Sequence, residues 1–513
     1  MSVRRLILVN LRCCPTLSSY LLAILLCTVT GHTQAAPSQP QTIIIDAAAP
    51  THPFPHFWEH MFGSGRAVLS LRESYRNDLK SVKQITDVEY IRFHGVFLDE
   101  MGVYDEDSHG NPVYNFSYVD QVYDGLLQNG VRPFVELSFM PTKLAAQELL
   151  QSFWYKPNVA PPKDFRKWDD LITAFTRHLV ERYGSDEVAK WYFEVWNEPN
   201  LDFWAGEPKQ PTYWELYDHT AADIKRVNSH LRVGGPATAQ AAWVDAFIRH
   251  CVEHHVPVDF VSTHVYGNDP PEPVLGTKDN VPRNRMVCRA VSKVHDQIKA
   301  SPLPNIPLLW TEFNASYKNE PEVTDSAYMG PWLADTIRQC DGLVNEMSYW
   351  TFSDVFEEQG VVKEPFYGGF GLIAAGSIPK PSYNAFRLLH RLGEERITVN
   401  SDTAVATRGK GGSLVLAVWD LVNPGDSGTA RNLVLKFEHL GKARHAYISR
   451  ADAEHGDVHS AYVKMGSPRY PTQAQLGQLR QASELPPPEK QDLKDGELIV
   501  SLPVNGLALI EIK

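Results

Sequence analysis

Short apolar runs alternate with longer amphipathic stretches from about residue 57 to residue 393. The runs are rich in β-branched and aromatic residues, which is typical of buried strands, and the stretches between them repeat apolar residues at helical spacing. The expected strands are His56–Phe62, Glu89–His94, Arg132–Leu137, Trp191–Trp196, Arg232–Pro236, Asp259–His264, Pro307–Glu312 and Glu346–Thr351. The expected helices are Val119–Gln128, Trp168–Tyr183, Tyr213–Asn228, Val244–His254, Met286–Ile298, Tyr328–Arg338 and Ser382–Leu392.

A strand followed by a helix, repeated about eight times, predicts a parallel sheet with helical crossovers. The number of units and the length of the segment fit an α/β fold of the (β/α)8 TIM-barrel type with long loops, which we place at residues 50–396. An open, doubly wound sheet is the alternative. That fold would carry a glycine-rich phosphate turn after its first strand, and the sequence has none there.

Beyond residue 396 the pattern changes to short strands separated by turn signals, which predicts a C-terminal β-sandwich over residues 397–513. The expected strands are Ser413–Trp419, Asn432–Phe437, Ala446–Arg450, Glu497–Leu502 and Leu507–Ile512. A strand-like segment at residues 41–47 is expected to join this sandwich. The stretch Gln473–Lys494 is rich in Gln, Pro and charge, and we expect it to be a mobile surface loop.

The N-terminus has the features of an export signal. Arg4, Arg5 and Arg12 precede an apolar run at residues 20–29, which is too short to span a bilayer comfortably. We therefore expect residues 1–35 to be a cleaved signal peptide, and an uncleaved anchor is the alternative. Cleavage would leave a secreted or periplasmic protein with no membrane span in the mature chain.

Three cysteines, Cys251, Cys288 and Cys340, follow the expected signal peptide. They are too few and too widely spaced for a disulfide scaffold or a metal cluster. One disulfide bridge and three buried thiols are equally compatible with the sequence.

The formal net charge of −12 offers no basic face, so nucleic acid is not an expected partner. Hydrophobic residues make up 43% of the chain, which is typical of a globular protein rather than a disordered one. The sequence indicates no oligomeric state.

Two glutamates follow strands of the expected barrel. Glu198 ends the fourth strand, where Pro199 cannot continue a strand ladder, and Glu312 ends the seventh. A closed barrel brings such residues to one mouth.

Two carboxyl groups at one mouth are what glycoside hydrolysis requires. Glu198 would be the acid/base, with a pKa raised by burial and by the second carboxylate, and Glu312 would be the nucleophile. Asn197 could hydrogen-bond the 2-hydroxyl of the sugar. The same two carboxylates could instead hold Mg²⁺, but hard-metal barrels usually supply three or more acidic ligands, so we expect no metal and no cofactor.

The motifs around these residues resemble those of the family 39 glycoside hydrolases, the group of β-xylosidases and α-L-iduronidases. The resemblance covers roughly residues 41–513, and its most specific elements are Phe193–Leu201, Trp310–Asn314 and Tyr349–Glu358. It implies a retaining mechanism with the acid/base after the fourth strand and the nucleophile after the seventh.

The resemblance also implies a set of sugar-binding residues. These are His94 after the second strand, His264 and Tyr266 after the sixth, and Trp350 and Glu358 after the eighth. The Tyr266 hydroxyl is expected to hydrogen-bond Glu312, and Trp350 is expected to form an apolar platform. The motif also decides for Glu358 over its neighbour Glu357. Phe139, just past the third strand, could line the same cleft or could equally serve in packing.

The sugar itself is predicted less directly. We favour release of terminal D-xylose from β-xylosides or xylo-oligosaccharides. An α-L-iduronidase would need a cation for the C5 carboxylate, and Lys278, Arg283, Arg285 and Lys363 lie in suitable loops. Iduronidase or another β-glycosidase specificity therefore stays open, as does a non-catalytic carbohydrate-binding barrel.

Overall fold

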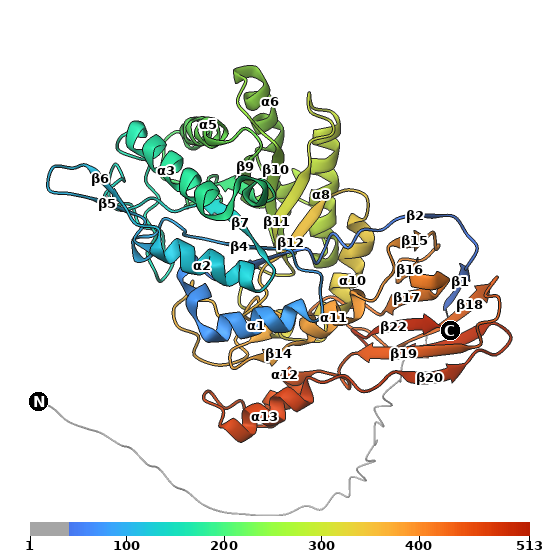
Figure 1. The fold of residues 1–513 in the computed structure, drawn as a ribbon. Coiled ribbons are helices and arrows are strands. Elements are labelled where there is room, and N and C mark those ends of the chain that lie inside the picture. The colour runs from blue at the N-terminus through green and yellow to red at the C-terminus, as the bar shows by residue number, and fades with distance from the viewer. Residues whose placement is uncertain (1–40) are drawn as a thin grey trace, which may run out of the picture. The chain divides into compact units, whose positions relative to one another are not determined.

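Eight parallel strands close into a barrel in the computed structural model, which describes residues 41–513 (Figure 1). They are β3 (Met61–Ser64), β4 (Tyr90–Phe93), β7 (Arg132–Leu137), β8 (Tyr192–Val195), β9 (Arg232–Thr238), β10 (Phe260–Tyr266), β11 (Leu308–Asn314) and β12 (Glu346–Tyr349). The last strand pairs with the first, with Ser348 opposite Met61, so the sheet has no free edge. The predicted TIM barrel is confirmed.

Helices follow the strands and surround the barrel (Figure 1). The long ones are α1 (Glu73–Lys83), α2 (Ser117–Gln128), α3 (Phe165–Tyr183), α5 (Lys209–Val227), α6 (Val244–His254), α8 (Arg283–Lys299), α10 (Met329–Cys340) and α11 (Pro381–Leu389). Shorter elements are α4 (Ser185–Val188), α7 (Pro271–Leu275), α9 (Pro321–Thr324) and the strand pairs β5 (Tyr104–Glu106) with β6 (Pro112–Tyr114) and β13 (Ile373–Ala374) with β14 (Ile378–Pro379). Within the described residues, no helix is long and apolar enough to cross a membrane.

Two sequence expectations in the first unit of the barrel were wrong or incomplete. The strand expected at His56–Phe62 is β3 and covers Met61–Ser64 instead. Phe57 and Trp58 made the segment before it look like a strand, but they are buried in the core without belonging to any strand. Helix α1 was not predicted. Its buried face consists of a few residues in an otherwise strongly polar segment, which hides the helical period.

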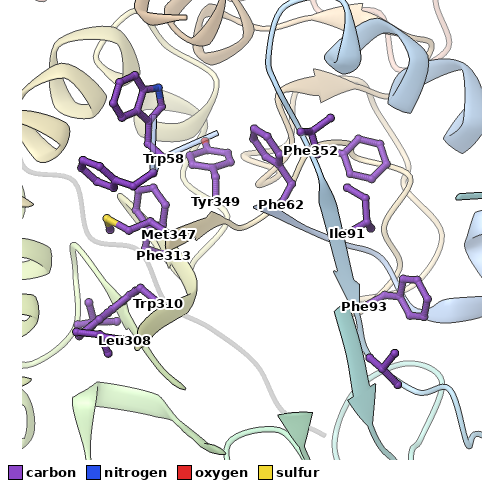
Figure 2. Close-up of a cluster of buried hydrophobic side chains, with 14 of the residues drawn as sticks. Trp58, Phe62, Ile91, Phe93, Leu308, Trp310, Phe313, Met347, Tyr349 and Phe352 are labelled. Carbon is purple, nitrogen blue, oxygen red and sulfur yellow. The ribbon is translucent and has the colours of Figure 1, made fainter. Parts of the chain in front are cut away.

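The outer faces of the strands pack against the helices. Figure 2 shows Ile91 and Phe93 pointing from β4 to the same side, in a cluster with Phe62, Phe313 and Tyr349. The Phe62 ring lies 5.1 Å from Phe386 of α11, and the Tyr349 ring lies 5.4 Å from it, so α11 is held by two adjacent strands. Burial of aromatic side chains on this scale is a main source of fold stability.

The inner faces form layers, because side chains alternate along a strand. Apolar residues cluster at the start of the strands: Met61, Tyr90, Phe134, Phe260 and Leu309, with Tyr192 packed against them. Two positions further along three of these strands come Arg92, Glu136 and Glu194, and Arg92 pairs with both glutamates inside the barrel. The apolar layer thus forms a floor under a buried charged layer.

Two sheets form the C-terminal part. One has seven strands in the order β2, β15, β16, β17, β22, β19, β20, and the other has three in the order β1, β18, β21. Their bounds are β1 (Gln41–Asp46), β2 (Thr51–Pro53), β15 (Glu395–Ile397), β16 (Ala404–Arg408), β17 (Leu414–Trp419), β18 (Arg431–Glu438), β19 (His445–Ala451), β20 (Glu489–Asp492), β21 (Glu497–Leu502) and β22 (Leu507–Ile512). The N-terminal strand β1 pairs in parallel with β18, with Ile43 opposite Leu435. Buried aliphatic residues of both sheets form one core, so the sandwich that was predicted together with the barrel is confirmed.

The stretch Gln473–Lys494 is ordered, contrary to the expectation of a mobile loop. It contains β20 and helix α13 (Gln473–Ala482), which packs beside α12 (Val458–Lys464). A capping box between Thr472 and Gln475 starts α13, and the Arg480 guanidinium donates to the Gly376 carbonyl at 2.6 Å. The polar composition of this stretch reflects an exposed helix rather than disorder.

One disulfide joins two barrel helices. Cys288 in α8 is bonded to Cys340 in α10, and Cys251 is a buried free thiol. The choice that the sequence left open is therefore resolved in favour of one bridge.

Replacing both bridged cysteines by serine should lower the free energy of unfolding. The bridge closes a loop of 52 residues, for which loop entropy predicts a loss of about 4 kcal/mol. Thermal unfolding with and without a reductant would measure this loss, with Cys251→Ala as the control. A reductant should lower the Tm of the wild type and of Cys251→Ala but not that of the double variant. An equal response of all three proteins would contradict a stabilising bridge.

Candidate active site

Glu198 and Glu312 meet at the carboxyl end of the barrel. The imidazole Nδ1 of His264 lies 3.1 Å from Glu198 Oε1 and 3.6 Å from Glu312 Oε1. The nearest carboxylate oxygens of the two glutamates are within 4.8 Å of each other. Glu198 has a left-handed backbone, with φ +44°, and its N–H donates to the Ala237 carbonyl at 2.8 Å. This uncommon conformation is fixed by the next strand, which is typical of functional positions.

Arg92 ties the charged layer of the barrel to the site. Its fully buried guanidinium contacts Glu194 Oε2 at 2.7 Å, Glu136 Oε2 at 2.8 Å, Glu312 Oε1 at 2.6 Å and Asn197 Oδ1 at 2.9 Å. Charge-assisted bonds of this kind are strong, and the planar guanidinium fixes the direction of each. One arginine therefore positions the Glu312 carboxylate and the Asn197 amide together.

Tyr266 holds the other oxygen of Glu312. Its hydroxyl donates to Glu312 Oε2 at 2.6 Å, so both carboxylate oxygens accept a hydrogen bond. Burial, followed by the charges of Glu312 and Glu198, raises the pKa of the Tyr266 phenol well above 10. The phenol therefore keeps its proton and acts as a donor, as expected from the sequence.

Glu198 lies in surroundings that favour its protonated form. Burial, then the negative charges of Glu312 and Asp269, raise its pKa well above 4.5, against a smaller opposite effect of Arg92. The two glutamates at the mouth thus differ in their contacts: Glu312 accepts bonds from an arginine and a phenol, whereas Glu198 contacts an imidazole.

The hydrogen bonds of His264 indicate where the proton lies. The Thr311 hydroxyl donates to Glu194 at 2.8 Å, so it can only accept from His264 Nε2 at 3.0 Å. Burial and the positive charge of Arg92 lower the pKa of His264 well below 6.5 and keep the ring neutral. We infer from these bonds that Nδ1 carries the lone pair and accepts a hydrogen bond from the protonated carboxyl group of Glu198.

The remaining sugar-binding candidates lie on the same side of the barrel mouth. His94 Nδ1 is 2.7 Å from Glu136, and its Nε2 is 3.8 Å from Glu358 Oε1. The Trp350 ring lies 4.8 Å from the ring of His94. A Cβ at position 63 would lie 2.1 Å from Trp350 Cε3, so Gly63 leaves the space that the indole occupies. All eight predicted site residues are thus brought together.

Neighbours that the sequence could not separate are distinguished by their contacts. Glu357 pairs with Arg66 at 2.9 Å and with Arg72 at 2.7 Å, whereas Glu358 faces the imidazole of His94. Burial, then the charges of Glu312 and Glu136, raise the pKa of Glu358 well above 4.5.

Phe139 belongs to the packing around the site. It is fully buried, and its ring lies 5.5 Å from Trp196 and 6.1 Å from Phe203. Its ring also lies 6.0 Å from the ring of His94, so Phe139 packs against a predicted sugar-binding residue.

Glu198, His264 and Glu312 are also close enough together to ligate a cation. Both oxygens of Glu312 are already engaged by Arg92 and Tyr266, and the buried positive charge of Arg92 repels a second cation at this distance. The donor set therefore fits a metal ion poorly, and we derive no chemical step through one.

Sequence reasoning missed Arg92, Glu136, Glu194 and Thr311 as parts of the site. A signal was present, since a charged residue inside an apolar strand run is rarely buried without a partner. In Tyr90–Phe93, Arg92 stands between two apolar residues. Side chains alternate along a strand, so Arg92 points into the barrel while its two neighbours point outward. Which acids it meets depends on the register of three strands.

Known proteins resemble this chain in sequence and in fold. The model of the glycosyl hydrolases family 39 matches residues 41–492. The chain is 39% identical over 471 residues to a β-xylosidase of Geobacillus stearothermophilus. The aligned residues cover 89% of this chain and 92% of that protein. The crystal structure of a monomeric β-xylosidase from Caulobacter crescentus CB15 has a TM-score of 0.84 and 35% sequence identity, and covers 92% of this chain and 99% of that one.

An α-L-iduronidase of Mus musculus is more distant. It is 24% identical over 257 residues, which cover 45% of this chain and 38% of that protein. The family resemblance that the motifs indicated is confirmed over both the barrel and most of the sandwich. The chain belongs to the glycosyl hydrolases of family 39 and is a glycoside hydrolase.

Proposed function

We propose that this glycoside hydrolase releases terminal D-xylose from β-xylosides or xylo-oligosaccharides by a retaining double displacement. The observation that carries the proposal is the close pair Glu198 and Glu312, whose oxygens approach within 4.8 Å. Retaining enzymes separate their carboxyl groups by about 5–5.5 Å, whereas inverting enzymes need about 6.5–9.5 Å to admit a water. The pair is therefore suited to direct attack.

In the first step the Glu312 carboxylate attacks the anomeric carbon while the bond to the leaving oxygen breaks. Glu198 gives its proton to that oxygen, and a glycosyl ester of Glu312 forms. In the second step water attacks the anomeric carbon, Glu198 takes the water proton, and the ester bond to Glu312 breaks. Both carboxyl groups return to their initial states.

The surrounding residues would bind and orient the sugar. Asn197 Oδ1 accepts from Arg92, so its Nδ2 is left to donate to the 2-hydroxyl of the sugar. Trp350, fixed by His94 and Arg92, offers an apolar ring face beneath the pyranose. His94 and Glu358 offer polar atoms for the remaining hydroxyls.

The contacts of the mouth cations favour xylose over iduronate. Arg283 pairs with Glu320 at 2.7 Å, and Lys278 lies 3.5 Å from Glu272 with 84% of its side chain exposed. Both cations already have carboxylate partners, which leaves them poorly placed for a substrate carboxylate. The greater similarity to β-xylosidases than to α-L-iduronidases supports the same choice.

We also propose that the protein is exported, and is secreted or periplasmic. The signal peptide expected at residues 1–35 lies outside the described residues. Support comes from the bridge between Cys288 and Cys340, since disulfides persist mainly in oxidising compartments.

Glu198→Ala should slow the cleavage of xylobiose by about 10²–10⁴-fold, because the poor leaving group loses its acid. An aryl β-xyloside with a good leaving group should still form the glycosyl-enzyme, and added azide should restore turnover by giving the β-linked xylosyl azide. Glu312→Ala is the matched variant, and it should lose turnover without yielding the β-azide. Failure of azide to rescue Glu198→Ala, or rescue as the α-azide, would remove Glu198 from the acid/base role. Product NMR distinguishes the two azides.

The pH dependence of xylobiose cleavage should show the raised pKa of Glu198. The acid must be protonated to act, so kcat/KM should fall as the pH rises through a pKa well above 4.5. In Glu198→Ala this basic limb should disappear. Glu312→Gln removes a neighbouring negative charge and should lower the pKa of Glu198, measured by NMR titration of the labelled carboxyl. An unchanged pKa in Glu312→Gln would contradict the coupling of the two acids.

A screen of aryl glycosides tests the sugar. Aryl β-xyloside should have the highest kcat/KM, ahead of α-arabinoside and β-glucoside, and α-iduronide should react least, because Arg283 is already paired with Glu320. A preference for α-iduronide would overturn the xylose proposal, and no turnover of any of these substrates would argue for a specificity outside this set.

A further inference from the structure

Two exposed aromatic residues flank the catalytic site. Trp154, in the loop between β7 and α3, and Tyr317, in the loop after β11, are 52% and 43% exposed. A single exposed aromatic side chain is common on a protein surface and needs no explanation by itself. These two, however, each contact a residue of the site: Tyr317 contacts Tyr266, and Trp154 contacts Glu358.

Tyr317 lies beside the residue that holds the nucleophile. Its ring is edge-on to the Tyr266 ring at 6.2 Å, and Tyr266 donates to Glu312. The Tyr317 backbone N–H donates to Asn268 Oδ1 at 3.0 Å, and Asn268 Nδ2 donates to the Ser316 hydroxyl at 2.9 Å. The backbone is thus fixed at two points while the ring stays open to solvent. A platform of this kind is pre-organised for a ligand.

The same turn reaches the side of the site where Glu198 lies. Asp269 follows Asn268 directly, and its Oδ2 accepts the Tyr266 N–H at 2.7 Å. His264, two residues before Tyr266 on β10, has its Nδ1 3.1 Å from Glu198 Oε1, so the end of β10 that leads into this turn lies beside that acid. The leaving group departs beside the acid that protonates it, which places Tyr317 on the leaving-group side.

Trp154 lies at the other end of the site. Its backbone N–H donates to the Glu358 carbonyl at 2.7 Å, and the Arg66 guanidinium lies 5.7 Å from its ring centre. Arg66 in turn pairs with Glu357. Trp154 therefore lies beside Glu358, one of the residues proposed to bind the sugar hydroxyls.

We infer that Tyr317, held by Asn268, is the platform of a leaving-group subsite. It takes the pyranose ring of the second xylose unit of a xylo-oligosaccharide, whose C–H face packs on the phenol ring. This inference rests on the proposed β-xylosidase function. It adds a specificity-determining residue for the leaving group, whereas the residues described above act on the sugar that is released.

Comparing xylobiose with β-xylosyl fluoride tests this subsite, because the fluoride has the same sugar but no leaving-group ring. Tyr317→Ala should lower kcat/KM for xylobiose about tenfold and leave that for the fluoride within about twofold. Tyr317→Phe keeps the ring and should behave as the wild type. Tyr470→Ala, an exposed tyrosine between α12 and α13, is the control and should change neither value. Activity on the fluoride also shows that each variant is folded.

Four other outcomes would count against the inference. An equal loss on both substrates in Tyr317→Ala would mean that the ring acts through Tyr266 and Glu312. A selective loss for xylobiose in Trp154→Ala but not in Tyr317→Ala would place the leaving group at the opposite end. If the wild type cleaved neither substrate, the proposed function would fail and the subsite with it, whereas normal cleavage by all variants would overturn the subsite alone.

Discussion

The site depends on one buried cation, the guanidinium of Arg92. It contacts Glu136, Glu194, Glu312 and Asn197 within 2.9 Å, and its side chain is fully buried inside the barrel. Burying this charge is costly unless nearly every donor finds an anionic or polar acceptor. The arrangement meets that condition and in doing so fixes the nucleophile candidate and the amide beside it. The contacts of Arg92 thus stabilise the barrel interior and also position Glu312, so a change at Arg92 would affect both.

The imbalance of charge around Arg92 determines where the protons lie. More carboxyl groups than cations crowd the mouth, and burial adds to their repulsion. The pKa of Glu136 stays below 4.5, because Arg92 and His94 outweigh the effect of burial. The pKa values of Glu198 and Glu358 rise instead. A neutral acid thus stands near a carboxylate held by Arg92, which is the condition that double displacement requires.

Local sequence patterns predicted the structure correctly where a single residue, such as a proline, or a regular apolar spacing marks an element. The apolar run before Pro199 located Glu198, although β8 itself ends at Val195, and the helix at Val244–His254 has the predicted bounds. They gave wrong predictions where an element was judged by its amino-acid composition alone. Helix α13 looked disordered because its exposed face is polar, although its capping box was readable in the sequence. Helix α1 was hidden for a similar reason.

The sequence by itself determined the barrel, the sandwich and the two glutamates, since strand alternation, helical spacing and a proline stop are local properties of the chain. Only the tertiary structure decided that Arg92 joins acids from three other strands, that Cys288 pairs with Cys340, and that Glu357 turns away while Glu358 faces the site. These facts depend on strand register and on helix packing. Both are set by the sum of many distant contacts, which no local pattern encodes.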